Sequence, residues 1–294
     1  MSKVNGIYAA TLSILNDDLS LNLEKTINHA ENIIDLGCHG VVFFGSTGQS
    51  QLISLTEKIQ LINNLPKSKH SDKFIIGTGL NSLSDTINLM KISQTNKLKR
   101  FLIMPPAYYK YKDEDVINFY SKIIENLPES EIILYNFEKL SGYIFSLKCV
   151  KDLVAKFPKQ IIGVKDSSYN LYDKLKLDNF SVLPGTETKL LNGLSMGCSG
   201  IITATANVTA SIARNVYDSF VENKDQKQNQ KLCNVRRTFD KYNLISGLHS
   251  FLIKKDSDFK NLIPPLHLLS KNEERELKTT LKNLNFNIEI SRAA

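Results

Sequence analysis

The chain has 294 residues, of which 42% are hydrophobic and 23% charged, the composition of an ordinary soluble protein of enzyme size. Its 37 basic and 30 acidic residues give a net charge of +7, but no helix-turn-helix, zinc-finger or RNA-binding motif accompanies them, which argues against nucleic-acid binding. We interpret the excess charge as solvated surface with a mild attraction for anionic substrates.

Short apolar runs alternate with amphipathic segments along most of the chain. Apolar residues recur at helical spacing over residues 23–34 and 116–127, and Ser54 with Glu57, Ser82 with Asp85, and Asp113 mark helix starts. The predicted strands are residues 6–14, 40–44, 74–78, 100–104, 131–135, 160–165, 180–183 and 200–205.

Eight strands, each followed by a helix, predict an α/β fold, a closed (β/α)8 TIM barrel. The main alternative, an open doubly wound sheet, would normally have fewer strands or a nucleotide-binding glycine motif.

The last part of the chain has a different pattern. From about residue 223 there is no strand signal, and helical stretches appear at residues 232–242, 244–253 and 273–284, with a break at Pro264-Pro265. The sequence therefore predicts a catalytic barrel over residues 1–222 and a helical extension over residues 223–294 that packs on the barrel.

Two polar residues end apolar strands that are close in the predicted barrel order. Lys165 follows Ile161-Ile162-Gly163-Val164, and Tyr135 follows Ile132-Ile133-Leu134. The carboxyl ends of barrel strands are where active sites are built. A lysine among apolar neighbours loses part of its proton affinity and can attack a carbonyl as a free amine, and a nearby phenol can transfer the protons. The pair suggests Schiff-base chemistry.

Two turns are expected on the same rim. Gly45-Ser46-Thr47-Gly48 follows the second strand, where hydroxyl and backbone N–H groups can converge on a carboxylate, although a simple capping turn is the plainer interpretation. Met104-Pro105-Pro106-Ala107-Tyr108-Tyr109 follows the fourth strand. Its tyrosines can equally cover the barrel mouth or fill a subunit contact.

Taken in order, these motifs resemble a known family. Gly45-Ser46-Thr47-Gly48, Pro106-x-Tyr108, Tyr135-Asn136, Gly163-Val164-Lys165-Asp166, and Gly197-x-x-Gly200 through Asn207 are similar to the dihydrodipicolinate synthase and N-acetylneuraminate lyase superfamily. The resemblance covers about residues 6–220, and the carboxy-terminal helices fit it too. It implies a pyruvate-dependent class I aldolase or lyase on a (β/α)8 barrel, usually a homotetramer built as a dimer of dimers.

The resemblance also implies roles for particular residues. Lys165 would form the imine with a 2-oxo acid, and Tyr135 would be the acid/base at the reacting carbon or its leaving oxygen. Ser46 and Thr47 would bind the carboxylate, and Thr47 would also link Tyr135 to Tyr108 in a hydroxyl relay. In the family this relay tyrosine comes from the neighbouring subunit.

Further positions follow from the same resemblance. Tyr109 is the alternative relay residue if the loop is shifted by one position. Gly185 and Ile202 would line the pocket near the imine.

Departures from the family pattern bear on the substrate. Synthases carry an arginine in the loop after Tyr-Asn, where this chain has Leu140, followed by Ser141 as on the lyase side. Glu138 replaces the usual proline and would repel a dicarboxylate, although Lys139 could compensate.

The seventh strand also departs from the family. After Gly185 the chain keeps only one acidic residue, Glu187, of the pair that binds sugar hydroxyls in the sialic-acid lyases, and Ala204 stands where those lyases have a serine. We expect Ser141, Thr203 and Glu187 to bind the hydroxyls of a 2-keto-3-deoxy sugar acid.

The sequence thus predicts reversible C–C cleavage or condensation of pyruvate, or of a 2-keto-3-deoxy sugar acid, with an aldehyde partner. The enzymatic alternative is 4-hydroxy-tetrahydrodipicolinate synthase, which condenses pyruvate with aspartate semialdehyde; the alternative from another class is a non-catalytic 2-oxo acid sensor. We expect no cofactor, no metal and no membrane partner. Four scattered cysteines, Cys38, Cys149, Cys198 and Cys233, and the absence of a signal-peptide pattern or a long apolar run predict a cytoplasmic protein.

Overall fold

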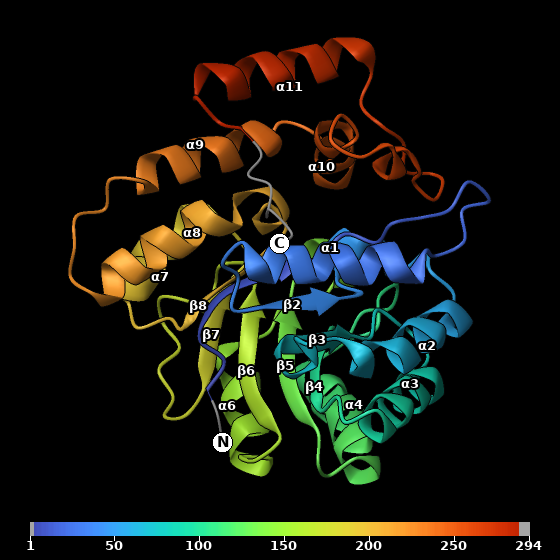
Figure 1. Ribbon diagram of the computed structural model, residues 1–294. Coiled ribbons are helices and arrows are strands. Elements are labelled where there is room, and N and C mark those ends of the chain that lie inside the picture. Colours follow the sequence, from blue (N-terminus) through green and yellow to red (C-terminus); the bar gives the residue numbers. More distant parts are fainter. Residues whose placement is uncertain (1–2, 288–294) are drawn as a thin grey trace.

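A computed structural model describes residues 3–287 as a barrel of parallel strands with helices outside it (Figure 1). The strands pair in the order β7-β6-β5-β4-β3-β2-β1-β8. The Ser199 N–H donates to the Val182 carbonyl, which joins the entry of β8 to β7 and closes the ring. The predicted TIM barrel is therefore confirmed. The strands are β1 (Gly6–Ala10), β2 (Gly40–Phe43), β3 (Phe74–Gly77), β4 (Arg100–Ile103), β5 (Glu131–Asn136), β6 (Ile161–Asp166), β7 (Ser181–Pro184) and β8 (Gly200–Thr203).

The barrel helices cover the outside of this ring, and within residues 3–287 four of the eight begin with a side-chain cap. Ser54, for example, forms the predicted capping box with Glu57. Asp113 is the first residue of its helix and does not cap it, because the helix begins after Lys112. The helices are α1 (Leu23–Asp35), α2 (Leu55–Asn64), α3 (Leu83–Thr95), α4 (Asp113–Asn126), α5 (Glu138–Ser141), α6 (Leu147–Lys156), α7 (Leu190–Ser195) and α8 (Ala206–Val221).

Side chains alternate between two apolar layers because successive strand residues face opposite sides. In β5, Ile133 and Tyr135 join a cluster inside the barrel, whereas Ile132 and Leu134 join the cluster between the strands and the helices. The inner position of Tyr135 at the end of β5 places its phenol at the barrel mouth.

Strand β6 contains one extra residue relative to β5. Ile132 pairs with Ile161, but the next residue, Ile133, pairs with Gly163, so the register shifts by one. A Cβ atom at Gly163 would lie 2.7 Å from the Ser181 carbonyl oxygen, so only glycine fits there. The shift brings Lys165 opposite Tyr135, so that the lysine faces the interior as the tyrosine does.

The first strand is shorter than the sequence predicts. After Thr11, whose N–H still donates to Val42 of β2, the chain leaves the sheet because other groups take over its hydrogen bonds. The Leu12 N–H donates to Asn207 Oδ1, and the Ile14 N–H donates to Thr26 Oγ1. Leu12 and Ile14 instead pack in an apolar cluster with the carboxy-terminal helices.

The carboxy-terminal extension lies across one side of the barrel, with α11 outermost and α9 and α10 beneath it (Figure 1). Its helices are α9 (Asn229–Phe239), α10 (Leu244–Leu252) and α11 (Lys271–Asn283). Since α8 ends at Val221, the division at residues 222 and 223 remains our proposal for the domain boundary.

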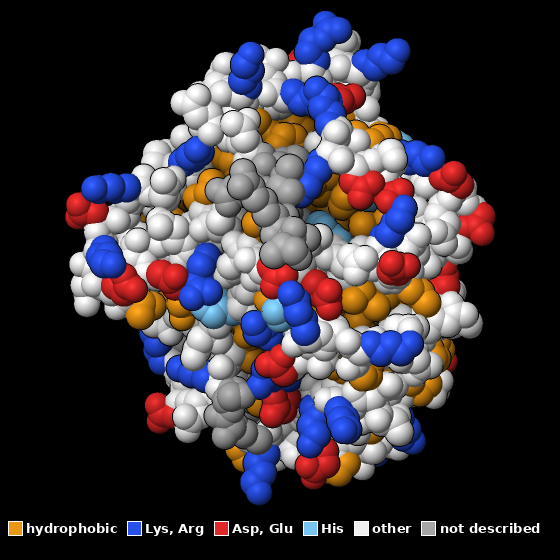
Figure 2. Space-filling model, viewed as in Figure 1, with side chains coloured by type: hydrophobic (Ala, Val, Ile, Leu, Met, Phe, Trp, Pro, Cys, Tyr) orange, Lys and Arg blue, Asp and Glu red, His pale blue; other side chains and the backbone are white. Residues whose placement is uncertain are grey.

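The surface and the cysteines fit the composition. Basic and acidic side chains are interspersed on the face shown in Figure 2. All four cysteines are buried and free. Within residues 3–287, no helix is long and apolar enough to cross a membrane.

Candidate active site at the barrel mouth

Lys165 and Tyr135 meet at the carboxyl ends of β6 and β5. The two residues are register partners, and Lys165 Nζ lies 4.2 Å from the centroid of the Tyr135 ring. Both side chains are buried. The structure therefore brings together the amine and the phenol that the strand-end pattern places on one rim.

The residues that follow them tie the two strand ends together. Asn136 Nδ2 donates to Asp166 Oδ1 at 2.8 Å. The Asp166 carboxylate also accepts backbone N–H bonds from Tyr169, Leu171 and Tyr172. Burial raises the pKa of Asp166, while these donors favour its charged form. The bond between Asn136 and Asp166 fixes the distance between the two strands one residue beyond the reactive pair.

The hydroxyl loop reaches the same point from β2. Ser46–Gly48 forms one turn of 3-10 helix, and Ser46 Oγ lies 3.1 Å from the Tyr135 hydroxyl. Thr47 is buried next to it. Ser46, and not Thr47 as predicted, therefore makes the hydroxyl contact with Tyr135.

A cavity of about 140 Å³ opens beside the Ser46–Tyr135 pair. It lies between the ends of β2, β3, β4 and β5, with α5 at its edge. Most of its wall is hydrocarbon. The side chains that form this apolar wall are Phe44, Leu102, Met104, Ala107 and Leu140.

The tyrosine loop after β4 points away from the protomer. Tyr108 is 90% exposed and Tyr109 68% exposed, and their rings form an edge-to-face pair with centroids 5.2 Å apart. Tyr108 also adopts a φ of +91°, in the left-handed region that side chains rarely occupy. Within one protomer, the predicted relay from Tyr135 through Thr47 to Tyr108 is not formed.

Glu187 is fully buried inside the protein, which does not fit its predicted role in binding sugar hydroxyls. Its carboxylate accepts bonds from Thr203 Oγ1 at 2.8 Å, Thr209 Oγ1 at 3.2 Å and Thr205 Oγ1. Arg236 of α9 completes the cluster with Nη1 at 3.2 Å. Glu187 and Thr203 thus connect the rim to the carboxy-terminal extension, and these internal bonds argue against the prediction that they contact substrate.

Ser141 is likewise engaged within the protein. Its hydroxyl bonds the carbonyls of Phe137 and Tyr143 and accepts from the Tyr143 N–H, which closes the turn after α5. Since Ser141 is also buried, the structure does not support its predicted contact with substrate.

The two predicted lining residues occupy different depths. Ile202 belongs to the interior apolar cluster that contains Tyr135. Gly185 follows β7, and a Cβ atom there would lie 2.3 Å from Ser167 Oγ, so the glycine lets the end of β7 approach the residues after Lys165. Their proximity to a bound imine stays a prediction.

Lys58 is a buried residue near the site that the sequence patterns did not single out. Its Nζ donates to the carbonyls of Thr78 at 2.9 Å and Gly79 at 3.4 Å, where β3 ends beside the cavity. Burial lowers the pKa of Lys58 to about 8. The sequence could have indicated its burial, because Lys58 lies on the apolar face of α2 with Leu61 and Ile62.

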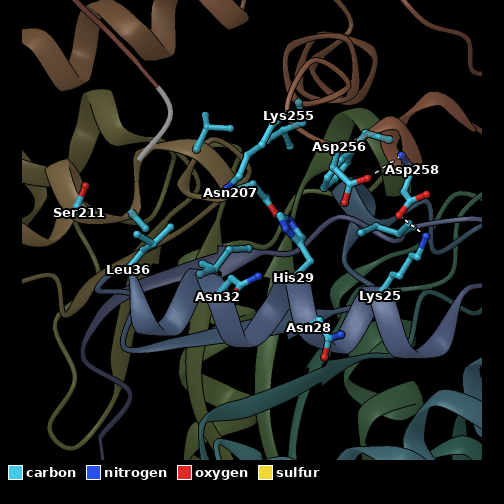
Figure 3. Close-up of a pocket in the computed structure, with 16 residues that line it drawn as sticks. Lys25, Asn28, His29, Asn32, Leu36, Asn207, Ser211, Lys255, Asp256 and Asp258 are labelled. Carbon is cyan, nitrogen blue, oxygen red and sulfur yellow. Dashed lines mark hydrogen bonds and ion pairs between the residues drawn. The ribbon is translucent and has the colours of Figure 1, made fainter. Parts of the chain in front are cut away.

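A second cavity, of about 210 Å³, lies away from the barrel mouth, between α1, α8 and the segment around residues 252–259 (Figure 3). His29 Nε2 and Asn207 Oδ1 are 2.9 Å apart in its wall, and Asn207 Nδ2 donates to the Ala10 carbonyl at the end of β1. Asn207 therefore links the wall of this cavity to the carboxyl end of β1. Nearby His249 is fully buried; its Nδ1 lies 2.9 Å from the Phe259 carbonyl oxygen, and its Nε2 has no partner.

We expect His249 to make folding sensitive to mild acid. Burial lowers the pKa of His249 to about 4, against about 6.5 in an unfolded chain. The unfolded state therefore takes up the proton first, so stability is lost as the pH falls from about 6.5 toward 4. The free energy of unfolding can be measured by chemical denaturation at several pH values across this range. Its dependence on pH should be weaker in His249→Gln than in the unchanged protein, by up to ~1.4 kcal/mol per pH unit. Equal slopes would exclude His249 as the cause.

The fold and the arrangement at its mouth define a barrel enzyme of the aldolase and lyase class. The chain belongs to the dihydrodipicolinate synthetase family, whose sequence profile matches residues 3–284. It is 28% identical over 225 residues to the 4-hydroxy-tetrahydrodipicolinate synthase of Methanopyrus kandleri, covering 74% of each chain. It is 24% identical over 231 residues to the 2-dehydro-3-deoxy-D-gluconate/2-dehydro-3-deoxy-phosphogluconate aldolase of Picrophilus torridus, covering 76% of this chain and 85% of that one.

Solved structures agree on the fold. The crystal structure of YagE, a prophage protein of the dihydrodipicolinic acid synthase family from E. coli in complex with pyruvate, superimposes with a TM-score of 0.88 at 22% identity and covers 97% of this chain and 100% of its own.

Proposed function

We propose that the protein is a class I aldolase or lyase in which Lys165 forms a Schiff base with pyruvate or a related 2-oxo acid. The observation that carries this proposal is the position of buried Lys165 Nζ, 4.2 Å from the Tyr135 ring centroid. The family and its named relatives support it, because both a synthase and a keto-acid aldolase are among them.

We assign a separate step of the reaction to each of these residues. The Lys165 amine adds to the C2 carbonyl of the 2-oxo acid and, with loss of water, forms an iminium ion. In the cleavage direction, the bond between C3 and C4 breaks, and its electron pair moves toward the iminium nitrogen to give an enamine. The C4 hydroxyl gives up its proton as the aldehyde forms, and Tyr135 takes it and exchanges a proton with Ser46, 3.1 Å away. Backbone and hydroxyl groups of Ser46 and Thr47 bind the carboxylate.

Borohydride trapping tests the proposal directly. The protein is incubated with pyruvate and sodium borohydride, and its intact mass is measured before and after digestion to locate the adduct. The proposal requires a reduced pyruvyl adduct on Lys165. Absence of an adduct would instead favour a non-catalytic sensor of 2-oxo acids, which needs no amine at its binding site.

A second candidate is 4-hydroxy-tetrahydrodipicolinate synthase activity, which the relative from Methanopyrus kandleri favours. It needs a fixed cation for the second carboxylate, and Leu140, 43% exposed at the cavity edge, supplies none. The assay that decides is pyruvate consumption with aspartate semialdehyde.

Tyr135→Phe should slow turnover by roughly a hundredfold or more, because the positioned proton donor is lost while Lys165 remains. The variant should still trap pyruvate with borohydride, more slowly than the unchanged protein. Steady-state assays alongside trapping separate the two effects. Turnover within threefold of the unchanged enzyme would remove Tyr135 from the proton path.

We further propose a cytoplasmic homotetramer in which Tyr108 completes the site of a neighbouring subunit. The exposure of Tyr108 and Tyr109 supports this, since an aromatic pair held out from one protomer is suited to a subunit contact. Tyr108→Phe should lower activity less than Tyr135→Phe, and activity should fall on dilution as subunits separate. A fully active monomer in sedimentation and activity measurements at the same dilutions would contradict the shared site.

A further inference from the structure

The cavity beside Tyr135 and Ser46 is where the second substrate would extend from the reacting carbon. It occupies about 140 Å³, and none of the described residues that line it carries a charge. Its polar side chains are Ser46, Ser50, Gln51 and Tyr135, whereas Phe44, Leu102, Met104, Ala107 and Leu140 make up most of its wall. An apolar cavity of roughly 150 Å³ holds a benzene ring in other proteins.

The groups best suited to a polyhydroxylated substrate are already paired. Glu187 is saturated by threonine hydroxyls and Arg236, and Thr203 Oγ1 both donates to Glu187 and accepts from Arg236 at 2.9 Å. Ser141 bonds to backbone groups of its own turn. A sugar chain would have to break these buried bonds or leave its own hydroxyls unpaired against hydrocarbon, and both are unfavourable.

We propose that the aldehyde partner has a short aliphatic or aromatic side chain, without further hydroxyls and without a carboxylate. This inference rests on the proposed function and narrows its substrate class. In the condensation direction, C3 of the Lys165-bound enamine attacks the aldehyde carbon, and the aldehyde oxygen gains a proton. Water then hydrolyses the iminium, which frees Lys165 and releases a 4-hydroxy-2-oxo acid with a hydrocarbon tail.

The aldehyde panel compares three chemistries with the full-length protein and pyruvate. Butanal and benzaldehyde represent the apolar class, glyceraldehyde and erythrose the polyhydroxylated class, and aspartate semialdehyde the charged class. Pyruvate consumption gives kcat/KM for each, and borohydride trapping of pyruvate runs in parallel. We expect kcat/KM for an apolar aldehyde to exceed that for the other two classes by about tenfold or more, because burying an unpaired hydroxyl or carboxylate against hydrocarbon costs free energy.

A matched pair of variants links the preference to the cavity. Leu140→Arg places a guanidinium at the edge of the cavity, at a partly exposed position that tolerates a longer side chain. It should raise the ratio of kcat/KM for aspartate semialdehyde to that for benzaldehyde by ~10-fold or more, since a carboxylate gains a charged hydrogen-bonding partner. Leu83→Arg makes the same change at the start of α3, also partly exposed, and should leave the ratio unchanged.

The outcomes distinguish a failure of the apolar-aldehyde inference from a failure of the proposed Schiff-base function. A pyruvate adduct together with a preference for glyceraldehyde, erythrose or aspartate semialdehyde would overturn the apolar-aldehyde inference and leave the Schiff-base function standing. Absence of any adduct would overturn the function itself. An equal response of Leu83→Arg and Leu140→Arg would show that this cavity does not select the aldehyde.

Discussion

Lys165→Ala should fold normally and lose turnover by several orders of magnitude. The amine is the covalent electron sink of the proposed reaction, and neither Tyr135 nor Ser46 can replace it. Lys165→Arg should fare little better, because a guanidinium stays protonated and forms no imine. The measurement is kcat/KM with the best aldehyde, accompanied by borohydride trapping, which should give no adduct in either variant.

The control is Lys151→Ala, which removes an exposed lysine from α6 and should leave turnover unchanged. Circular dichroism and thermal unfolding establish that each variant is folded. Retention of more than a tenth of the original activity in Lys165→Ala would remove this residue from the mechanism.

Among the variants described, Arg236→Met should be the most destabilised, with a free energy of unfolding lower by about 3–5 kcal/mol. The substitution leaves the fully buried Glu187 carboxylate without its cation, and removing one partner of a buried ion pair is costly because the other charge remains desolvated. The free energy of unfolding from chemical denaturation at neutral pH measures the effect.

Two further variants isolate the ion pair. In the double variant Glu187→Gln/Arg236→Met, the charge is gone as well, so we expect recovery of a substantial part of the loss. Arg237→Met changes the neighbouring, exposed arginine and should alter stability by no more than ~0.5 kcal/mol. If Arg236→Met lowered the free energy of unfolding no more than Arg237→Met, the ion pair with Glu187 would not contribute to stability.

The sequence predicted the barrel and the meeting of Lys165 with Tyr135 because both rest on local information. Strand length, alternation and the residue at the strand end are visible in a few consecutive positions, and the barrel order then brings neighbouring ends together. The choice between Ser46 and Thr47 was not accessible in this way. It depends on how a single 3-10 turn rotates its hydroxyls, and Gln49 ends that turn in a left-handed conformation.

The role of Glu187 could not be predicted because its partner is distant in the chain. Arg236 lies 49 residues further on, in a helix of the extension, and nothing in the spacing indicates that it folds back to the rim. The prediction that Glu187 binds substrate came from the resemblance to the sialic-acid lyases, which carry an acidic pair at this place. Its full burial shows how a long-range ion pair can occupy such a residue completely.

The extra residue in β6 has a consequence for comparing sequences. Without the bulge, Ile162 would pair with Ile133 and Lys165 with Asn136, and regular alternation would turn the lysine outward, into the layer that Leu134 and Val164 now fill. A related barrel with one residue fewer before Gly163 would need no bulge, because its regular pairing already sets the lysine opposite the tyrosine and facing inward. A one-residue gap at this point of an alignment therefore leaves the amine in the site, whereas an extra residue without a bulge turns it away.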